Sequence, residues 1–236
     1  MGTGKVKPGQ KIEVKAADGS QQELTAKNII IATRARSREL PNLKQDGKKV
    51  IGYRQAMVLP ELPKSMVVVG SGAIGVEFAY FYATMGTKVT IVEFMENIVP
   101  VEDEDVSKQM LRSLKKTGIE ILTSSSVESV DTSGTGCKVQ VKTAAGMQTI
   151  ECDIVLSAAG IVANIENIGL EETGIKTEKG KVVVDEFYNT SVKGYYAIGD
   201  IVGGQSLAHV ASAEGILCVE KIAGQHVEPL DYNNIP

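Results

Sequence analysis

The most constraining feature of the sequence is a cluster of three glycines between an apolar run and a helical pattern. Gly70, Gly72 and Gly75 follow directly on the apolar residues 66–69 and lead into a segment rich in apolar residues. A second apolar run then ends in Glu93, 18 residues after the last glycine. A strand, a tight turn, a helix and a second strand in this order make a βαβ unit. The pattern therefore predicts a parallel sheet with helices packed against it.

The spacing GxGxxG gives each glycine a separate task in binding a dinucleotide. Gly70 allows the tight turn, Gly72 lets the backbone approach a pyrophosphate, and Gly75 lets the helix pack closely on the sheet. The pyrophosphate is expected on the helix N-terminus. The predicted binding segment is Gly70, Ser71, Gly72, Ala73, Ile74 and Gly75. The alternative is a glycine-rich turn in a βαβ unit that binds no nucleotide.

Glu93 selects between the two nicotinamide cofactors. A carboxylate at the tip of the second strand accepts hydrogen bonds from both ribose hydroxyls but repels a 2′-phosphate. Residues 94–97 supply no Arg or Lys that could receive such a phosphate. The sequence therefore favours NAD over NADP.

Composition narrows the class of protein. The chain has 236 residues, 43% of them hydrophobic, with a net charge of −4 and no lysine or arginine stripe. These values predict a soluble enzyme and argue against nucleic acid or a membrane as partner. Cys137, Cys152 and Cys218 have no CxxC or CxxxxC spacing, so we expect inert thiols, no metal site and a cytoplasmic location.

Two predicted helices fit the same α/β architecture. A helix is predicted over 73–85, with an apolar stripe at Ile74, Phe78, Tyr82 and Met85. A second is predicted to begin in the acidic run 102–105 and to end at Lys115, Lys116 and Gly118, with a stripe at Val106, Met110, Leu111 and Leu114. The acidic run fits helix-end electrostatics, and a functional acid cluster is the alternative.

Short strands account for most of the other segments. Residues 5–31 predict a small antiparallel meander, and 119–122 a third parallel strand. Residues 127–130, 138–142 and 148–151 predict a β-meander packed on the parallel sheet, and 153–158 a buried strand of that sheet. Further strands are expected at 182–185 and 195–198, a helix at 209–223, and a linker from 226 onward.

Four blocks in this order resemble the pyridine nucleotide-disulphide oxidoreductases, over nearly the whole chain. They are NIIIATRARSRELP at 28–41, GSGAIGVEFAYFYATMGTKVTIVE at 70–93, SAAGIVANIENIGLEETGI at 157–175 and YYAIGDIVGGQSLAHVASAEG at 195–215. The second and fourth are the most specific. Within the family the chain is most similar to members that oxidise protein-bound dihydrolipoamide and pass hydride through FAD to NAD.

The resemblance also implies site residues. It adds Val127 beside the adenine and Gly160 near the nicotinamide ribose to the NAD site. It places Ala32, Thr33, Asp200, Leu207, Ala208 and His209 at FAD, with Asp200 accepting a hydrogen bond from the ribitol. By itself, an Asp after 198–199 equally fits a turn or helix cap. Glu77 resembles a glutamate with a supporting catalytic role near the flavin, and an exposed polar helix residue is the alternative.

The family pattern divides the chain into a Rossmann-like NAD-binding domain inserted in an incomplete FAD-binding domain. The expected limits are 63–186 for the NAD-binding domain, 1–62 and 187–232 for the two FAD-binding parts, and 233–236 for the start of an interface domain. The sequence departs from the family where Arg34 replaces a glycine, and where Ile161 and Ala163 replace an Arg-Pro pair.

Three further family features have no counterpart in the sequence: a second GxGxxG for FAD, a CxxxxC redox pair and a C-terminal His-Glu base. We therefore expect this fragment alone to be inactive and to lose FAD. For the intact protein the expected partners are lipoyl domains of 2-oxo acid dehydrogenase or glycine cleavage complexes and a second subunit. Other disulphide reductases, of the mercuric or glutathione reductase type, and a non-catalytic NADH-binding module are the competing interpretations.

Overall fold

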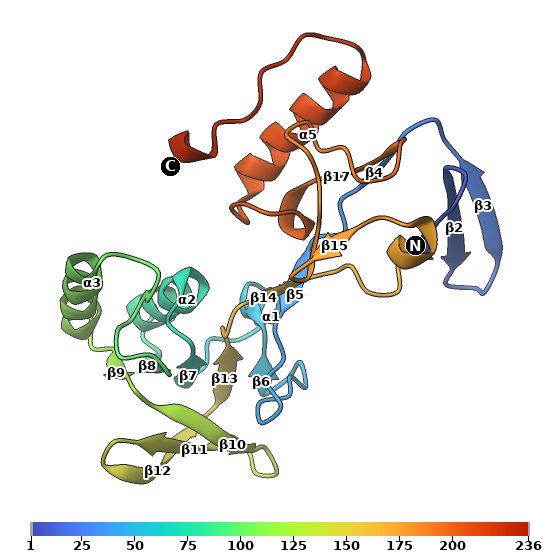
Figure 1. The fold of residues 1–236 in the computed structure, drawn as a ribbon. Coiled ribbons are helices and arrows are strands. Elements are labelled where there is room, and N and C mark those ends of the chain that lie inside the picture. Colours follow the sequence, from blue (N-terminus) through green and yellow to red (C-terminus); the bar gives the residue numbers. More distant parts are fainter. Residues whose placement is uncertain (1, 236) are drawn as a thin grey trace. The chain divides into compact units, whose positions relative to one another are not determined.

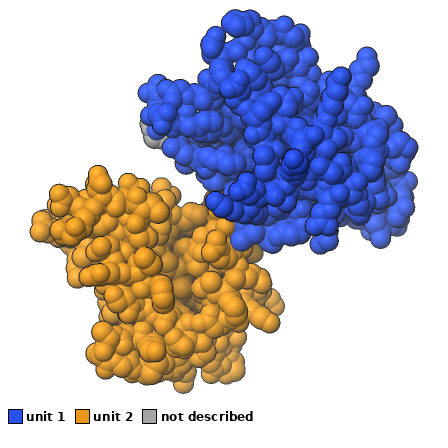
Figure 2. All heavy atoms as spheres, viewed as in Figure 1, with its two compact units in different colours: residues 1–36, 162–236 blue, residues 37–161 orange. Residues whose placement is uncertain are grey.

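The chain folds into two compact units with separate hydrophobic cores (Figure 1, Figure 2). The computed structural model describes residues 2–235. We call residues 37–161 the inner unit, and residues 1–36 together with 162–236 the outer unit, after their order in the sequence. The chain passes between them within the short strands β5 (Ala35–Ser37) and β14 (Ile161–Ala163). The inner unit begins and ends about 25 residues earlier than the predicted NAD-binding segment 63–186, because it is defined by compactness, whereas that prediction followed the family's cofactors.

A parallel sheet forms the centre of the inner unit. Its five strands are β6 (Val50–Ile51), β13 (Ile154–Ser157), β7 (Ser65–Val69), β8 (Lys88–Val92) and β9 (Glu120–Leu122), in that spatial order. All neighbours run parallel, as predicted from the βαβ pattern. The central strand β7 leads directly into the glycine turn, so the turn lies at the carboxyl edge of the sheet, where ligands bind in open α/β folds.

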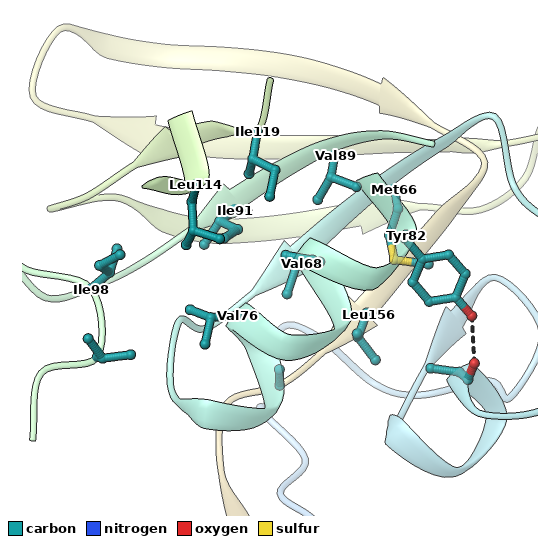
Figure 3. Close-up of a cluster of buried hydrophobic side chains, with 14 of the residues drawn as sticks. Met66, Val68, Val76, Tyr82, Val89, Ile91, Ile98, Leu114, Ile119 and Leu156 are labelled. Atoms are coloured by element: carbon teal, nitrogen blue, oxygen red, sulfur yellow. Dashed lines mark hydrogen bonds between the residues drawn. The ribbon is translucent and has the colours of Figure 1, made fainter. Parts of the chain in front are cut away.

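The two faces of this sheet are covered by different structures. Met66 and Val68 of β7 pack on the side of the helices α1 (Tyr53–Ala56), α2 (Ala73–Thr84) and α3 (Glu104–Lys116) (Figure 3). Val67 and Val69 pack against the antiparallel meander β10 (Ser126–Asp131), β11 (Cys137–Thr143) and β12 (Gly146–Cys152). Alternate residues of a strand point to opposite faces, so an unbroken apolar strand is buried on both.

The two long helices of the inner unit begin and end where the sequence indicates. Gly72 is the N-cap of α2, and Gly86 follows its C-cap with φ = +101°, the left-handed conformation that glycine adopts without steric cost. Asp103 is the N-cap of α3, with acidic residues in its first turn and lysines in its last. This charge order favours the helix dipole at both ends.

The predicted helix stripes are wrong at one position each. Met85 is 56% exposed and Val106 is 45% exposed. The buried residues of α2 are Gly75, Val76, Ala79 and Tyr82, and the small ones among them let the helix approach the sheet closely. The buried residues of α3 are Ser107 and Leu114, and the Ser107 hydroxyl donates to the carbonyl oxygen of Val99 at 3.5 Å.

The outer unit combines small sheets with a long helix. Its elements are β1 (Gly2–Lys7), β2 (Lys11–Ala16), β3 (Gln21–Thr25), β4 (Ile29–Ile31), α4 (Leu170–Thr173), β15 (Thr177–Glu178), β16 (Lys181–Val182), β17 (Tyr195–Ala197), the 3₁₀ turn η1 (Gly199–Ile201), α5 (Ala208–Ile222) and the 3₁₀ turn η2 (Tyr232–Asn234). Strands β1 to β3 form the predicted antiparallel meander.

Three details of this unit differ from the predictions. Strand β4 pairs in parallel with β17 instead of joining the meander, so residues 166 positions apart are neighbours. The strand predicted at 182–185 is reduced to β16, which pairs with β15 across a tight turn at Lys179 and Gly180, and beyond it Val184 makes only an isolated bridge to Thr190. The segment from 226 is not only a linker, since Tyr232 hydrogen-bonds to Glu214 of α5.

Candidate functional site

The glycine turn of the inner unit requires glycine at its first position. Gly70 has φ = +101°, and its N–H donates to the carbonyl oxygen of Val92 at 2.9 Å. A Cβ added to Gly70 would lie 2.6 Å from the carbonyl oxygen of Ala158, the residue that follows β13. Both the backbone angle and the neighbouring backbone therefore exclude a side chain at this position.

The other two glycines serve different purposes. A Cβ on Gly75 would fall on the carbonyl oxygen of Gly70, so glycine is needed for the helix to start against the turn. A Cβ on Gly72 would meet nothing within 4 Å. The space beside Gly72 is thus open to a ligand, and α2 has neither a side-chain cap nor an acidic residue in its first turn to occupy its N-terminal N–H groups.

The rest of the predicted binding segment is divided between surface and core. Ala73 is exposed and Ile74 is partly buried against the helix-side cluster. Ser71 is fully buried, and its carbonyl oxygen accepts the N–H of Val99 at 3.0 Å. No sequence pattern indicates this hydrogen bond between Val99 and Ser71, which holds the loop after β8 beside the glycine turn.

Glu93 lies at the end of β8 and is buried, with 6% of its surface exposed. Its Oε2 accepts hydrogen bonds from the backbone N–H of Ser71 at 2.7 Å and from the Ser71 hydroxyl at 2.6 Å. Its Oε1 accepts the N–H of Met95 at 2.8 Å. A carboxylate has about four lone-pair sites, and these bonds use three. The carboxylate faces the turn, with room on Oε1 for one further donor.

The other residues expected around NAD differ in accessibility. Gly160 is exposed, has φ = +98° and accepts the N–H of Arg38 at 2.9 Å. Val127 is 5% exposed and packs in the meander-side cluster, where its carbonyl oxygen accepts the side-chain amide of Asn42. Glu77 is exposed on α2. The edge of Gly160 is thus open to a ligand, whereas the Val127 side chain is mostly enclosed.

A pocket of about 440 Å³ lies in the outer unit, where β17, η1 and the start of α5 meet the loop after β4. It brings together four residues predicted to bind FAD: Ala32, Asp200, Leu207 and Ala208. It is also lined by Arg34, Ile198, Gly199, Ser206 and Ala211, which were not predicted as site residues. In the sequence, each of these five residues lies within two positions of a residue predicted to bind FAD, and this proximity was the signal that could have found them.

Two residues expected at FAD do not line this pocket. The hydroxyl of Thr33 donates to the carbonyl oxygen of Asn164 at 2.6 Å, and the Asn164 amide donates to the Thr33 carbonyl oxygen at 3.0 Å. His209 is exposed near the start of α5. Thr33 therefore anchors the loop that carries Ala32 and Arg34.

Arg34 has a left-handed backbone conformation, at the position where the family pattern has a glycine. Its φ is +66°, in the left-handed region, which costs an L-residue roughly 1–2 kcal/mol. Its carbonyl oxygen accepts the N–H of Asn164 at 2.9 Å. Arg34 lines the pocket and so adds a cationic residue to its wall.

An ion pair next to this segment holds it in place. Arg36 forms two parallel hydrogen bonds to Glu166, from Nη1 at 2.9 Å and from Nη2 at 2.8 Å. Its Nη1 also lies 2.9 Å from Oδ1 of Asn164. Hydrogen bonding to Arg36 lowers the pKa of Glu166 to about 2. The loop 32–36 is thus tied to residues 163–166 through both backbone and side chains.

The three cysteines are free and buried, as predicted. Burial raises the pKa of the Cys152 thiol to about 12 and that of Cys218 to about 11, so both stay protonated near neutral pH. Among residues 2–235 no three metal-ligating side chains come together. No described helix has the length and apolar character needed to cross a membrane.

Comparisons with known proteins agree with this geometry. The family model for pyridine nucleotide-disulphide oxidoreductases matches residues 2–215. Dihydrolipoyl dehydrogenase of Zymomonas mobilis is 44% identical over 100% of this chain and 51% of its own length. The Rhizobium etli enzyme of the same name is 48% identical over 90% of this chain and 44% of its own length.

A solved structure resembles the whole chain in fold. It is LpdA of Mycobacterium tuberculosis, which has a TM-score of 0.86 and 33% sequence identity and covers 98% of this chain and 51% of its own. The chain spans about half the length of the relatives that it matches.

Proposed function

The chain belongs to the pyridine nucleotide-disulphide oxidoreductase family, and on that premise we propose that it is the NAD-binding portion, with parts of the FAD-binding domain, of a dihydrolipoyl dehydrogenase. Residues 63–186 are assigned to NAD, residues 1–62 and 187–232 to FAD, and residues 233–236 to the start of an interface domain. The glycine turn with Glu93 at the neighbouring strand end carries this proposal most directly.

NAD binding follows from the charges and the open space at the turn. The pyrophosphate takes the free N–H groups at the start of α2, beside Gly72, where no protein atom would meet a side chain. Glu93 receives an adenosine ribose hydroxyl on its remaining Oε1 lone pair. A second hydroxyl can replace the Ser71 hydroxyl on Oε2, since that O–H is free to rotate. Gly160 then supplies an unobstructed backbone edge near the nicotinamide end.

The outer pocket fits a part of FAD. Ile198, Leu207 and Ala211 give it apolar wall for a ring system, and the half-buried Asp200 offers a carboxylate to a sugar or polyol hydroxyl. The bound flavin would supply the hydride and electron transfer. These residues bind and orient it, and Glu77 on α2 has at most a supporting role.

In the complete protein we propose protein-bound dihydrolipoamide as reductant, presented by lipoyl domains, with a second subunit as partner. No two cysteines of this sequence have CxxxxC spacing. We therefore assign cofactor binding and orientation, and not thiol chemistry, to the residues described above.

Calorimetric titration tests the NAD assignment. The chain is titrated with NADH and, separately, with NADPH at the same ionic strength. NADH should bind more tightly, because the 2′-phosphate of NADPH would face the Glu93 carboxylate in a buried setting. Tighter binding of NADPH, or binding of neither, would refute the assignment.

The absorbance spectrum tests how completely flavin is held. We expect the purified chain to be colourless, since the pocket in the residues assigned to FAD fits only a part of that cofactor. Added FAD should still bind weakly and saturably, which quenching of flavin fluorescence would report. A yellow preparation would show that the pocket retains FAD unaided.

A further inference from the structure

Glu214 is a charged residue at the centre of a buried helix face. It is 1% exposed on α5, between the buried residues Val210 and Leu217. Its Oε2 accepts the backbone N–H of Gly199 at 2.5 Å, and its Oε1 accepts the hydroxyl of Tyr232 at 2.7 Å. Burying a carboxylate costs free energy unless it is hydrogen-bonded, so Glu214 needs both of these partners to remain buried.

The first partner connects Glu214 to the flavin pocket. Gly199 has φ = +74° and directly precedes Asp200, and both line that pocket. A Cβ on Gly199 would lie 3.4 Å from the Cβ of Ala211, another lining residue. Glu214 itself does not line the pocket, so any influence on Asp200 passes through the Gly199 backbone.

The second partner connects Glu214 to the C-terminal tail. The Tyr232 hydroxyl lies 3.1 Å from the Tyr188 hydroxyl as well as 2.7 Å from Glu214. The Tyr232 ring also packs on Gly204, where an added Cβ would lie 2.9 Å from a ring carbon. Gly204 leads into Ser206 and the start of α5, which form another wall of the pocket. Tyr232 thus contacts one of these segments directly, at Gly204, and is linked to the Gly199–Asp200 turn through Glu214.

We propose that Glu214 is a positioning residue for the Gly199–Asp200 turn. Tyr232, which belongs to the C-terminal tail, docks against Glu214 and sets the position of its carboxylate. Glu214 holds the turn through the Gly199 N–H, and Tyr232 occupies the other carboxylate oxygen, which fixes the rotamer. The consequence for flavin affinity rests on the proposed function, whereas the link from Tyr232 to Gly199 does not.

Hydrogen exchange of the Gly199 amide tests the link without any cofactor. Tyr232→Phe removes one hydroxyl and should speed exchange at residues 199–201 by roughly fivefold or more, the effect of one hydrogen bond of about 1 kcal/mol. Tyr195→Phe is the matched control, because it removes another buried hydroxyl of the same unit, bonded to Gln10 and Lys7. Equal exchange at 199–201 in the wild type and Tyr232→Phe would overturn the proposal.

Two substitutions of Glu214 separate positioning from mere packing. Glu214→Gln keeps an oxygen for Gly199 and offers its amide to the Tyr232 oxygen, so exchange at 199–201 should stay within about threefold of wild type. Glu214→Leu fills similar space but leaves the Gly199 N–H without an acceptor, and exchange should rise more than tenfold. If Leu and Gln behaved alike, the carboxylate would only fill space and the proposal would fail.

Titration with FAD, followed by flavin fluorescence, tests the consequence. Tyr232→Phe should weaken binding about fivefold, and this effect should disappear in the Asp200→Ala background, because the coupling runs through Asp200. An undiminished effect in that background would overturn the route through Asp200. If the wild type showed no saturable binding while Tyr232→Phe still altered exchange at Gly199, the link would stand and the flavin assignment would be refuted.

Discussion

The glycine turn of the inner unit and the loop at 32–34 of the outer unit both need a residue with positive φ, and they meet the need differently. Gly70 adopts φ = +101° without a side chain, and Ala158 leaves no room for one. Arg34 adopts φ = +66° with a full side chain in a pocket wall. A position crowded by backbone excludes every residue but glycine, whereas a position at a pocket tolerates another residue at the cost of strain.

The glycine turn itself contains a position crowded by backbone, Gly75, and an open position, Gly72. Alanine substitutions at these two positions give the sharpest test of the contrast between crowded and open positions. Gly75→Ala places a methyl group on the Gly70 carbonyl oxygen and should destabilise the inner unit by roughly 1–3 kcal/mol. NADH binding should be lost with it. The methyl group added by Gly72→Ala would lie in open space, so this variant should keep the thermal midpoint of the wild type but bind NADH more weakly. Thermal unfolding of both variants measures their stability, and calorimetric titration measures their affinity for NADH. Equal thermal midpoints would show that the turn can shift to accommodate a methyl group.

Reversing the charge at Glu93 tests whether the turn recognises the ribose. Glu93→Arg should raise the NADPH-to-NADH affinity ratio about tenfold or more, a change of roughly 1.4 kcal/mol. Ser71→Ala is the control, since it removes one hydrogen bond to Glu93 and leaves the charge. Calorimetric titration of both variants gives the ratios. A ratio unchanged by Glu93→Arg would mean that Glu93 serves only to hold Ser71 and Met95.

Arg34 provides the corresponding test in the outer unit. Arg34→Gly relieves the left-handed strain, whereas Arg34→Ala removes the same charge and keeps the strain. The glycine variant should be more stable than the alanine variant by about 1 kcal/mol in chemical denaturation. Equal stability would show that the loop relaxes when the side chain is shortened.

The ion pair beside Arg34 should have the smallest effect. The pKa of Glu166 is lowered to about 2, so the folded state gains from its charge above about pH 4.5 and loses this gain as pH falls towards 2. Both side chains are about half exposed, so solvent screens the pair and Glu166→Gln should cost under ~1 kcal/mol at pH 7. Denaturation of wild type and variant should converge at pH 2, and a constant gap would assign the loss to packing.

The inner site could be predicted because its parts lie close together in the sequence. The glycines, the helix and Glu93 all fall within residues 66–93, where spacing alone fixes their relation. The helix stripes failed at Met85 and Val106, since burial there depends on which neighbours approach. The hydrogen bonds from Ser71 and Met95 to Glu93 were equally invisible, because they depend on how the loop after β8 folds back.

By itself, the sequence determined the βαβ unit, its glycine turn and the family, because strand, turn and helix each follow from local spacing and backbone sterics. The tertiary structure alone decided which further residues lie around Asp200 and support its turn. Pairing of β4 with β17 brings Arg34 to the same pocket, and the fold of the tail brings Tyr232 to Glu214. Contacts between residues so far apart depend on packing across the whole unit, which no local pattern encodes.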